Sequence, residues 1–395
     1  RAWHRLSFFG GEVMVAPKLR FQEFDDAWSN SKIDDIAVVT SGGTPSRSNL
    51  TFWDGNIPWV TTSLVDFNII QSAEEFITQK GLDNSSAKLF PKNTILMAMY
   101  GQGITRGKVA ILGIDATTNQ ACAAIKLQSN YDTQFIFQNL MSRYEEIRDL
   151  SNDGGQKNLS AGIIKEIEVY YPEKTEQIKI ASFLSVVDEK ISQFNQKHEL
   201  LSQYKQGMMQ KLFSQQIRFK ADDGSEFGEW QENQLLDLST KKSSKVTAKD
   251  IEDNDGDYIV FGASGHFRNI NSYTESEPYI AIVKDGAGAG RLFLMPEKSS
   301  VLGTLEIVKP NLNIQLNFLF YRMQLIDFSS YIKGSTIPHV YFKDYSQEKI
   351  YLPCLEEQTK IANFLSAIDQ KIEVVAQQIE QAKTWKKGLL QQMFI

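Results

Sequence analysis

A gapless internal repeat constrains this chain of 395 residues more than any other feature. Residues 176–213 and 357–394 are separated by a constant offset of 181 residues and are identical at 17 of 38 positions. The segments before them also correspond, more weakly, since Gly155 to Pro172 resembles Gly334 to Pro353. Internal repeats mark duplicated structural units. The sequence therefore predicts two copies of one unit, each a variable globular part followed by a long helix.

Both repeated segments carry an apolar seam whose residues recur at alternating steps of three and four, which is typical of a coiled coil. A helix of 38 residues at roughly 1.5 Å per residue is about 57 Å long. Because the first helix leads into the second globular part and the second helix ends the chain, paired seams require antiparallel helices. The alternative is that each helix packs only against its own globular part. The predicted seam residues are Ile180, Leu184, Val187, Ile191, Phe194, His198, Leu201, Tyr204, Met208 and Leu212, and Ile361, Leu365, Ile368, Ile372, Val375, Ile379, Ala382, Trp385, Leu389 and Met393.

These patterns predict an α+β fold: two globular, α/β-mixed heads joined by two long antiparallel coiled-coil helices with pseudo-twofold symmetry. We expect the first head at 14–172, the central helix at 173–214, the second head at 215–353 and the C-terminal helix at 354–395, with 1–13 an extension outside the fold. Short β-like runs alternate with Gly- and Ser-rich loops in both heads. The predicted strands include Thr94–Ala98, Val109–Leu112, Ala121–Leu127, Tyr279–Val283, Arg291–Met295 and Thr304–Val308.

Composition and motifs exclude several classes of function. The net charge is −6, from 42 Lys and Arg against 48 Asp and Glu, so any anion site must be local. The two cysteines, Cys122 and Cys354, exclude a disulfide framework and a Cys-type zinc site and favour a reducing, cytoplasmic compartment. The sequence contains no run of 18 apolar residues, so it gives no sign of a helix that spans a membrane. We find no catalytic constellation and no metal-ligand spacing, and GAGAGR at 286–291 lacks the ending of a nucleotide-binding loop.

The loops of both heads combine flexible glycines with hydroxyl, amide and isolated cationic side chains. Such side chains contact phosphates and read base edges: Arg pairs with guanine, Asn or Gln with adenine, and Ser or Thr with either. Each loop taken alone can also be an ordinary turn. The candidate DNA-binding residues are Ser46, Arg47, Thr61, Thr62, Arg106, Lys108, Gln156 and Lys157 in the first head, and Lys241, Lys242, Ser264, His266, Arg268, Arg291, Ser335, Thr336 and His339 in the second.

Several residues outside the predicted seam are identical in the two helices, so burial in the seam does not explain them. Shared ancestry is one explanation. Another is that both helices present the same surface to two copies of one partner, with the two phenylalanines either in that contact or widening the core. The candidate docking residues are Phe183, Asp188 and Lys190 in the first copy and Phe364, Asp369 and Lys371 in the second.

The phrases GGTPSRSN, FWDGNIPWVTTSLVD, YPEKTEQIKIASFLSVVDEKI, GSTIPH and YLPCLEEQTKIANFLSAIDQKI resemble the specificity subunit of type I restriction–modification enzymes, and the resemblance extends from about Pro17 to Ile395. It implies that each head is a target recognition domain for one half of a split, asymmetric DNA site. It also implies that the helices are spacers that dock two methyltransferase subunits, and that the full complex recruits motor–nuclease subunits.

The resemblance further implies a non-catalytic subunit without a cofactor of its own. S-adenosylmethionine is then expected on the methyltransferase partner, and ATP and Mg on the motor–nuclease partner. No methyltransferase motif is present in the chain, which agrees with that expectation. The alternative from a different class is a protein–protein adaptor whose heads bind peptide or glycan.

Overall fold

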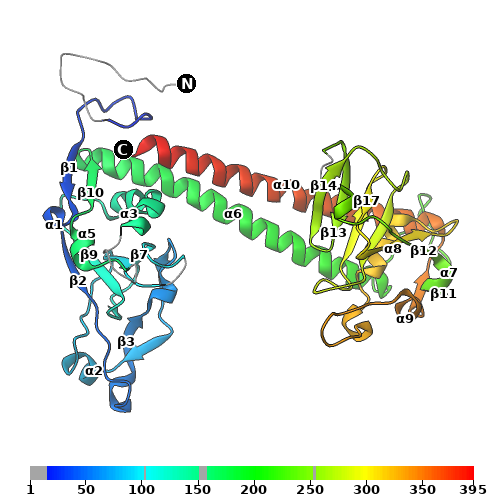
Figure 1. The fold of residues 1–395 in the computed structure, drawn as a ribbon, viewed down its shortest axis with the longest axis horizontal. Coiled ribbons are helices and arrows are strands. Elements are labelled where there is room, and N and C mark those ends of the chain that lie inside the picture. Colours follow the sequence, from blue (N-terminus) through cyan, green and yellow to red (C-terminus); the bar gives the residue numbers. More distant parts are fainter. Residues whose placement is uncertain (1–15, 102–103, 151–157, 252–254) are drawn as a thin grey trace. The chain divides into compact units, whose positions relative to one another are not determined.

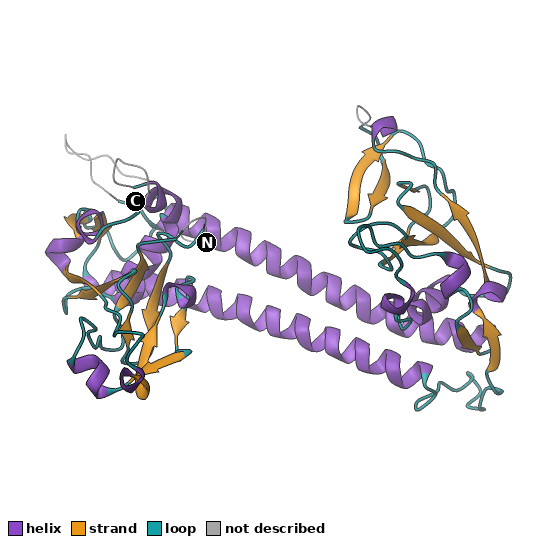
Figure 2. Ribbon diagram, turned by 60° about the horizontal axis from the view of Figure 1, so that its bottom comes forward, coloured by secondary structure: helices purple, strands orange, loops and turns teal. Residues whose placement is uncertain are grey.

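The computed structural model describes residues 16–101, 104–150, 158–251 and 255–395. The chain forms two compact units, one made of the residues up to Gln193 together with Gln378–Ile395, the other of Phe194–Gln377. Each unit therefore combines one globular head with a segment of each long helix (Figures 1 and 2).

The two long helices are α6, Lys174–Phe213, and α10, Leu355–Met393. In each unit a segment of α6 and a segment of α10 lie side by side and run in opposite directions (Figure 1). Asp188 pairs with Lys386 at 2.5 Å in the first unit. Lys205 pairs with Asp369 at 2.7 Å in the second. The two ion pairs join equivalent positions of the repeat, so the predicted antiparallel pairing is found in both units. Among the described residues, no helix is long and apolar enough to cross a membrane.

The predicted seam is correct near the heads but wrong at one equivalent pair of positions. Leu184 and Leu365 are fully buried. In contrast, Tyr204 and Trp385 have 51% and 55% of their surface exposed. Trp385 still contacts Phe183 of the other helix, with ring centres 6.2 Å apart, so it lies at the exposed edge of the helix pair rather than inside its seam.

The first head contains a five-stranded sheet in the order β2-β9-β6-β7-β4, a three-stranded sheet β5-β3-β8 and the pair β1-β10. Strands β6 and β7 are buried along their whole length, which explains their unbroken apolar sequences. The strands are β1 Ser29–Lys32, β2 Ala37–Ser41, β3 Trp53–Val60, β4 Ile69–Ile70, β5 Glu75–Ile77, β6 Ile95–Ala98, β7 Val109–Leu112, β8 Thr117–Thr118, β9 Cys122–Leu127 and β10 Glu168–Tyr171; the helices are α1 Ile33–Ile36, α2 Gln79–Asp83, α3 Thr133–Ser142, α4 Tyr144–Asp149 and α5 Ala161–Lys165.

The second head repeats this plan with sheets β12-β18-β15-β16 and β14-β13-β17 and the pair β11-β19. The six predicted strands are confirmed as β6, β7 and β9 in the first head and β15, β16 and β18 in the second, with ends shifted by at most two residues. The elements are β11 Gln231–Gln234, β12 Ser239–Ser243, β13 Tyr258–Gly262, β14 Gly265–Ile270, β15 Tyr279–Val283, β16 Leu292–Met295, β17 Ser300–Val301, β18 Leu305–Pro310, β19 Lys349–Leu352, α7 Leu235–Leu238, α8 Leu316–Met323 and α9 Phe342–Tyr345.

The first residues of each long helix hold the helix to its head through buried polar side chains. Glu176 and Glu357 are fully buried, and each receives two hydrogen bonds from one arginine, Arg20 at 2.7 and 2.8 Å and Arg218 at 2.7 and 3.0 Å. The next residue, Gln177 or Gln358, accepts a 2.9 Å hydrogen bond from the backbone N–H at the start of α3 or α8. These contacts explain why Glu and Gln are identical in the two copies without lying in the seam.

Removing Arg218 should destabilise the second unit, because Glu357 would keep its buried charge without a cationic partner. Loss of one partner of a buried ion pair costs about 3 kcal/mol or more. We therefore expect Arg218→Ala to lower the free energy of unfolding by about that amount in urea titrations. The control is Lys220→Ala, which removes a pair with Glu226 whose side chains are 60% and 68% exposed, and it should change stability by less than about 1 kcal/mol. Equal losses for both variants would contradict this account of the junction.

Candidate nucleic-acid interface

Each head places the loop between two paired central strands against the segment that precedes a short helix. In the first head, the backbone N–H of Leu159, just before α5, donates to the carbonyl of Met99, just after β6, at 2.9 Å. In the second head, the N–H of Val340, before α9, donates to the carbonyl of Lys284, after β15, at 2.9 Å. We call these the loop pairs: 99–101 and 104–108 with 158–160, and 284–291 with 333–341. The two heads thus build the same exposed feature from different residues.

In the second head the loop pair gathers many of the predicted DNA-binding residues. His339 Nδ1 lies 2.7 Å from Asp285 Oδ1 across the two loops. Arg291 donates to the carbonyl of Ala263 at 3.2 Å, which brings the loop of Ser264 to the same place. Ser335 and Thr336 are exposed between them. His266 lies farther along β14, where its Nε2 is 2.8 Å from Asn269 Oδ1. Asp285 was not among the predicted residues, because an acidic side chain is not itself expected to face DNA.

Two glycines allow the tight path of this loop pair. Gly290 and Gly334 have φ angles of +91° and +93°, which L side chains rarely adopt. A Cβ atom on Gly290 would lie 2.5 Å from Phe328, and one on Gly334 would lie 2.5 Å from the carbonyl oxygen of Ile337. The flexible glycines seen in the sequence are therefore positions where the backbone turns too sharply for a side chain.

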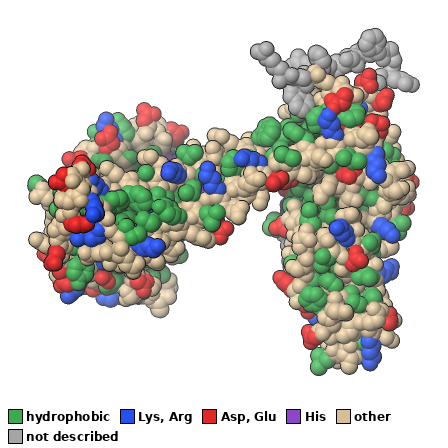
Figure 3. All heavy atoms as spheres, turned by 180° about the vertical axis from the view of Figure 1, so that it is seen from behind, with side chains coloured by type: hydrophobic (Ala, Val, Ile, Leu, Met, Phe, Trp, Pro, Cys, Tyr) green, Lys and Arg blue, Asp and Glu red, His purple; other side chains and the backbone are tan. Residues whose placement is uncertain are grey.

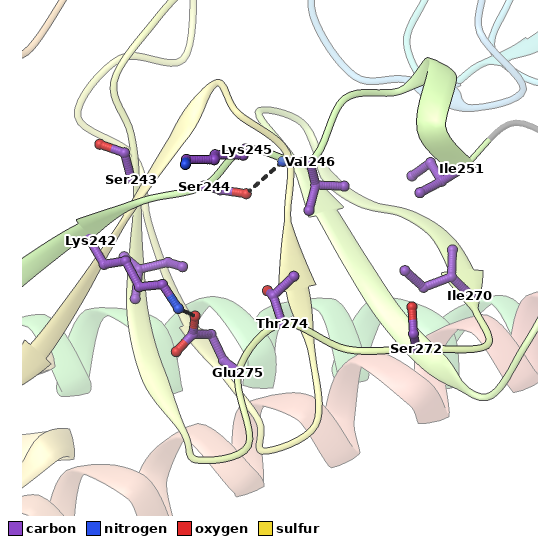
Figure 4. Close-up of a pocket in the computed structure, with 11 residues that line it drawn as sticks. Lys242, Ser243, Ser244, Lys245, Val246, Ile251, Ile270, Ser272, Thr274 and Glu275 are labelled. Atoms are coloured by element: carbon purple, nitrogen blue, oxygen red, sulfur yellow. Dashed lines mark hydrogen bonds and ion pairs between the residues drawn. The ribbon is translucent and has the colours of Figure 1, made fainter.

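One other predicted residue of the second head, Lys242, lines a separate cavity of about 550 Å³ (Figure 4). Lys242 lies in its wall and forms a 2.5 Å ion pair with Glu275, which also pairs with Lys309 at 2.7 Å. Burial of Glu275 favours its neutral form, but hydrogen bonds from the two lysines outweigh burial and lower its pKa. Lys241 pairs with Glu306 at 3.0 Å, and Arg268 donates to the carbonyl of Ile251, which lines the cavity, at 3.1 Å. These cations are engaged within the head rather than gathered at the loop pair.

The first head holds its predicted cations in similar internal contacts. Lys108 forms a 2.5 Å ion pair with Asp66, and Arg106 donates to the carbonyl of Arg148 at 3.2 Å. Both lie in or beside the loop between β6 and β7, as part of the loop pair. Gln156 and Lys157 lie outside the described residues.

Arg47 is held between aromatic rings and a carboxylate, in a second group of loops of the first head. Its guanidinium lies 3.7 Å from the centre of the Trp53 ring and 4.8 Å from that of Trp59. Both of its terminal nitrogens bond to the carboxylate of Glu75. This hydrogen bonding lowers the pKa of Glu75 and raises that of Arg47. The arginine is thus presented in one rigid orientation.

The same group of loops positions the remaining predicted residues of the first head. Ser46 bonds to Ser48 at 2.8 Å, and Thr61 bonds to Ser63 at 2.5 Å. The backbone of Gly43 donates to the carbonyl of Thr118 at 2.8 Å, which joins the loop after β2 to β8. Thr62 begins the short 3₁₀ helix Thr62–Leu64 that leads towards Asp66. Two loops far apart in sequence therefore meet here, as they do in the loop pairs.

The candidate docking residues divide into inward and outward groups. Phe183 packs edge-on against Phe21 and Trp385, with ring centres 5.8 and 6.2 Å apart. Phe364 packs against Phe219 at 5.6 Å. The two aspartates form the interhelical ion pairs described above, while Lys190 and Lys371 are exposed. The phenylalanines therefore do widen the core, at its solvent-facing edge.

The surface charge agrees with a local rather than a general site for nucleic acid. Figure 3 shows Lys and Arg side chains interspersed with Asp and Glu over the visible face of each unit. Among the described residues, no group of three or more His, Cys, Asp or Glu side chains is arranged to hold a metal ion. The arrangement can recognise a surface through positioned donors and acceptors, and contacts of this kind distinguish base edges.

Comparison with known proteins identifies the family. A family model described as type I restriction modification DNA specificity domain matches the chain twice, at residues 25–202 and 228–384, and the chain belongs to this family. Specificity subunits confer sequence preference and are not themselves catalytic, so the predicted class of non-enzymatic DNA-specificity protein is confirmed. The two matches also agree with the internal repeat.

The relatives match over most of their length. The chain is 25% identical over 400 residues to the type I restriction enzyme MjaIX specificity subunit of Methanocaldococcus jannaschii, covering 92% of this chain and 91% of that protein. It is 22% identical over 355 residues to the EcoprrI specificity subunit of Escherichia coli, covering 85% and 86%.

Solved structures of similar fold confirm the predicted two-domain architecture. The S subunit of a type I restriction–modification system from M. genitalium superimposes with a TM-score of 0.65 at 19% identity, covering 96% of this chain and 99% of that one. A chain from a structure describing complex assembly and conformational transition of the type I R-M system superimposes with a TM-score of 0.53 at 14% identity, covering 92% and 96%.

The contact between Arg47 and Glu75 should make a small, pH-dependent contribution to stability. Since the pKa of Glu75 is lowered below its ordinary 4.5, the contribution is fully present above that pH and is lost as the pH falls through the lowered value. Both side chains are partly exposed, so we expect about 0.2–1 kcal/mol. Urea unfolding of the wild type and Glu75→Gln at pH 7, 5 and 3 measures the difference. An advantage of the wild type that increased on acidification would be inconsistent with the ion pair.

Proposed function

We propose that this chain selects the DNA sequence on which a type I restriction–modification complex acts, with each head recognising one half of a split, asymmetric site. The observation that carries the proposal is that both heads build the same loop pair from unlike residues. Arg106 and Lys108 occupy it in the first head, and Arg291 and His339 in the second. Two heads that share one backbone framework but carry different side chains in their loops are suited to recognising two different short DNA sequences. Membership of the DNA specificity family supports the same function.

We propose double-stranded DNA as the ligand and protein subunits as the partners of this chain. Two methyltransferase subunits would bring S-adenosylmethionine, and motor–nuclease subunits would bring ATP and Mg, so that this chain needs no cofactor. The net charge of −6 suits a subunit whose partners supply many phosphate contacts. The isolated chain should then bind DNA weakly and with strong dependence on salt. Such a complex would work in the cytoplasm, where its DNA is.

The paired helices are proposed to set the number of unread base pairs between the two motifs. Half-site spacing follows protein geometry in other two-part DNA readers. The support here is that the same antiparallel pairing, with the same Asp–Lys contact, occurs beside each head. Because each helix is joined to its head by a buried carboxylate, we expect the distance set by the helices to change only when residues are added to or removed from them.

Each unit also offers a solvent-facing helical surface on which a methyltransferase subunit is proposed to dock. Phe183, Val186, Trp385 and Gly388 form this docking face in the first unit. Residues three apart on a helix share a face, and Phe183 contacts Trp385. Val186 is 63% exposed and Trp385 is 55% exposed. The equivalent residues of the second unit are Phe364, Ala367, Tyr204 and Gly207.

The two glycines support docking because no contact within the chain requires a residue without a side chain at these positions. A Cβ atom on Gly207 or Gly388 would meet nothing within 4 Å. Glycine within a helix costs about 1 kcal/mol relative to alanine. A partner backbone approaching closely at these two positions explains the cost. Duplication of the face suits a partner present in two copies, and Lys190 and Lys371 add a cation to each face.

The proposed function is tested by sequencing methylated motifs in DNA treated with this chain and its methyltransferase partner. We expect one motif made of two different short sequences around an unread spacer. Arg291→Ala should relax or change one base position in one half only, at a cost of about 1–3 kcal/mol if the side chain pairs with a base. A complex without any sequence preference would favour the adaptor alternative, and changes in both halves would contradict independent heads.

The docking face is tested by filling the space beside its glycine. Gly388→Leu should block one methyltransferase subunit and Gly207→Leu the other, each weakening binding at its site at least about tenfold, which is about 1.4 kcal/mol. Native mass spectrometry measures the stoichiometry. The control is Lys383→Leu, a change at an exposed position of the same helix outside the docking face. Isolated variants should melt no earlier than the wild type, because leucine is the better helix former. Full assembly with both glycines replaced would rule out this face.

A further inference from the structure

His339 is the most completely positioned of the predicted DNA-binding side chains in the second loop pair. Its backbone N–H and carbonyl both bond to Lys333, at 2.7 and 2.9 Å. Its ring stacks on Tyr341 with an interplanar angle of 19°. Its Nδ1 lies 2.7 Å from Asp285 Oδ1. The side chain nevertheless keeps 34% of its surface exposed, so one edge of the ring faces solvent in a fixed orientation.

The contact with Asp285 decides which ring nitrogen carries the proton. A carboxylate can only accept hydrogen bonds, so Nδ1 must donate. In the neutral imidazole the other nitrogen, Nε2, is then an acceptor. Among the described residues Nε2 has no hydrogen-bond partner of its own. An oriented and unsatisfied acceptor at the exposed edge of a loop suits a donor on a ligand.

We propose that Asp285 sets the base preference of the second head by holding His339 in the form that accepts at Nε2. This inference rests on the proposed function and specifies the chemistry of one contact. On the major-groove edges of DNA, cytosine presents only a donor and adenine a donor beside the acceptor N7, whereas guanine and thymine present only acceptors. His339 therefore selects adenine or cytosine at one position of one half-site. Asp285 is a positioning residue, since it acts through the histidine.

The first head cannot use this device, which agrees with a different second motif. The hydrogen bonds that define the loop pairs make Met99 equivalent to Lys284 and Leu159 equivalent to Val340. The neighbouring residues, Tyr100 and Asn158, therefore occupy the places of Asp285 and His339. A phenol and an amide replace the carboxylate and the imidazole. The same two positions of the scaffold thus carry different hydrogen-bonding groups in the two heads.

The sharpest test is Asp285→Asn, which keeps size and shape. The amide group can donate to Nδ1, so the ring can place its proton on Nε2 and become a donor there. At one position guanine and thymine, which offer only acceptors, should gain, and cytosine, which offers only a donor, should be lost, while adenine can remain through its acceptor N7. We expect the ratio of the methylation rate of sites with guanine or thymine to that of sites with cytosine to shift by about tenfold or more. The measurement is sequencing of methylated genomic DNA treated with the complete methyltransferase complex at pH 8, with wild type and variant in parallel.

Two further variants make the outcome unambiguous. Asp344→Asn removes another carboxylate near this loop, paired with Lys333 at 2.7 Å, and should leave the motif unchanged. His339→Ala should relax the same position without a new preference, and it keeps the test possible if Asp285→Asn fails to assemble. A wild-type complex that prefers no sequence would refute the proposed function itself. A selective wild type with the same motif in Asp285→Asn and His339→Ala, or relaxation without a new base in Asp285→Asn, would overturn only this inference.

Discussion

The buried carboxylate at the start of each long helix is the contact on which the rest of the structure depends. Glu176 and Glu357 have no exposed surface, and each is paired with an arginine from the segment that leads into its head. Burying an ion pair does not by itself add much stability, but separating the two partners is costly, which disfavours arrangements that part them. Because the carboxylate pairs with its arginine, the start of the helix is held to its head in one arrangement. The loops of the head are then oriented relative to that helix by the same junction.

A duplicated scaffold of this kind separates structure from specificity. The buried strands and junction residues are shared between the heads, whereas the loop pairs differ in charge, hydrogen bonding and aromatic content. Side chains in loops held by backbone hydrogen bonds can change without disturbing the sheets below. In such a chain, the loop residues of one head can change while the other head and the helix junctions stay as they are.

Prediction from the sequence succeeded where the signal was local. The strands around Ile95 and Ile280 were found because buried strands are continuous apolar runs. The placement of Tyr204 and Trp385 in the seam was wrong, because both side chains lie at the exposed edge of the helix pair, and spacing by three and four does not separate that edge from the buried seam. His339 was correctly singled out as a loop residue, but its partner Asp285 was missed, since the two lie 54 residues apart and nothing in their spacing joins them.

The sequence by itself determined that the chain is a duplicated unit with two long amphipathic helices, because identity at a constant offset and helical periodicity are properties of the linear order of residues. It also excluded a cofactor loop and a general basic surface. Only the tertiary structure decided which loops meet, which cations are already neutralised within the head and which ring nitrogen of His339 is paired with Asp285. These contacts depend on the order of the strands in the sheets and on hydrogen bonds between segments that are far apart in the sequence, and such contacts form only in the folded head.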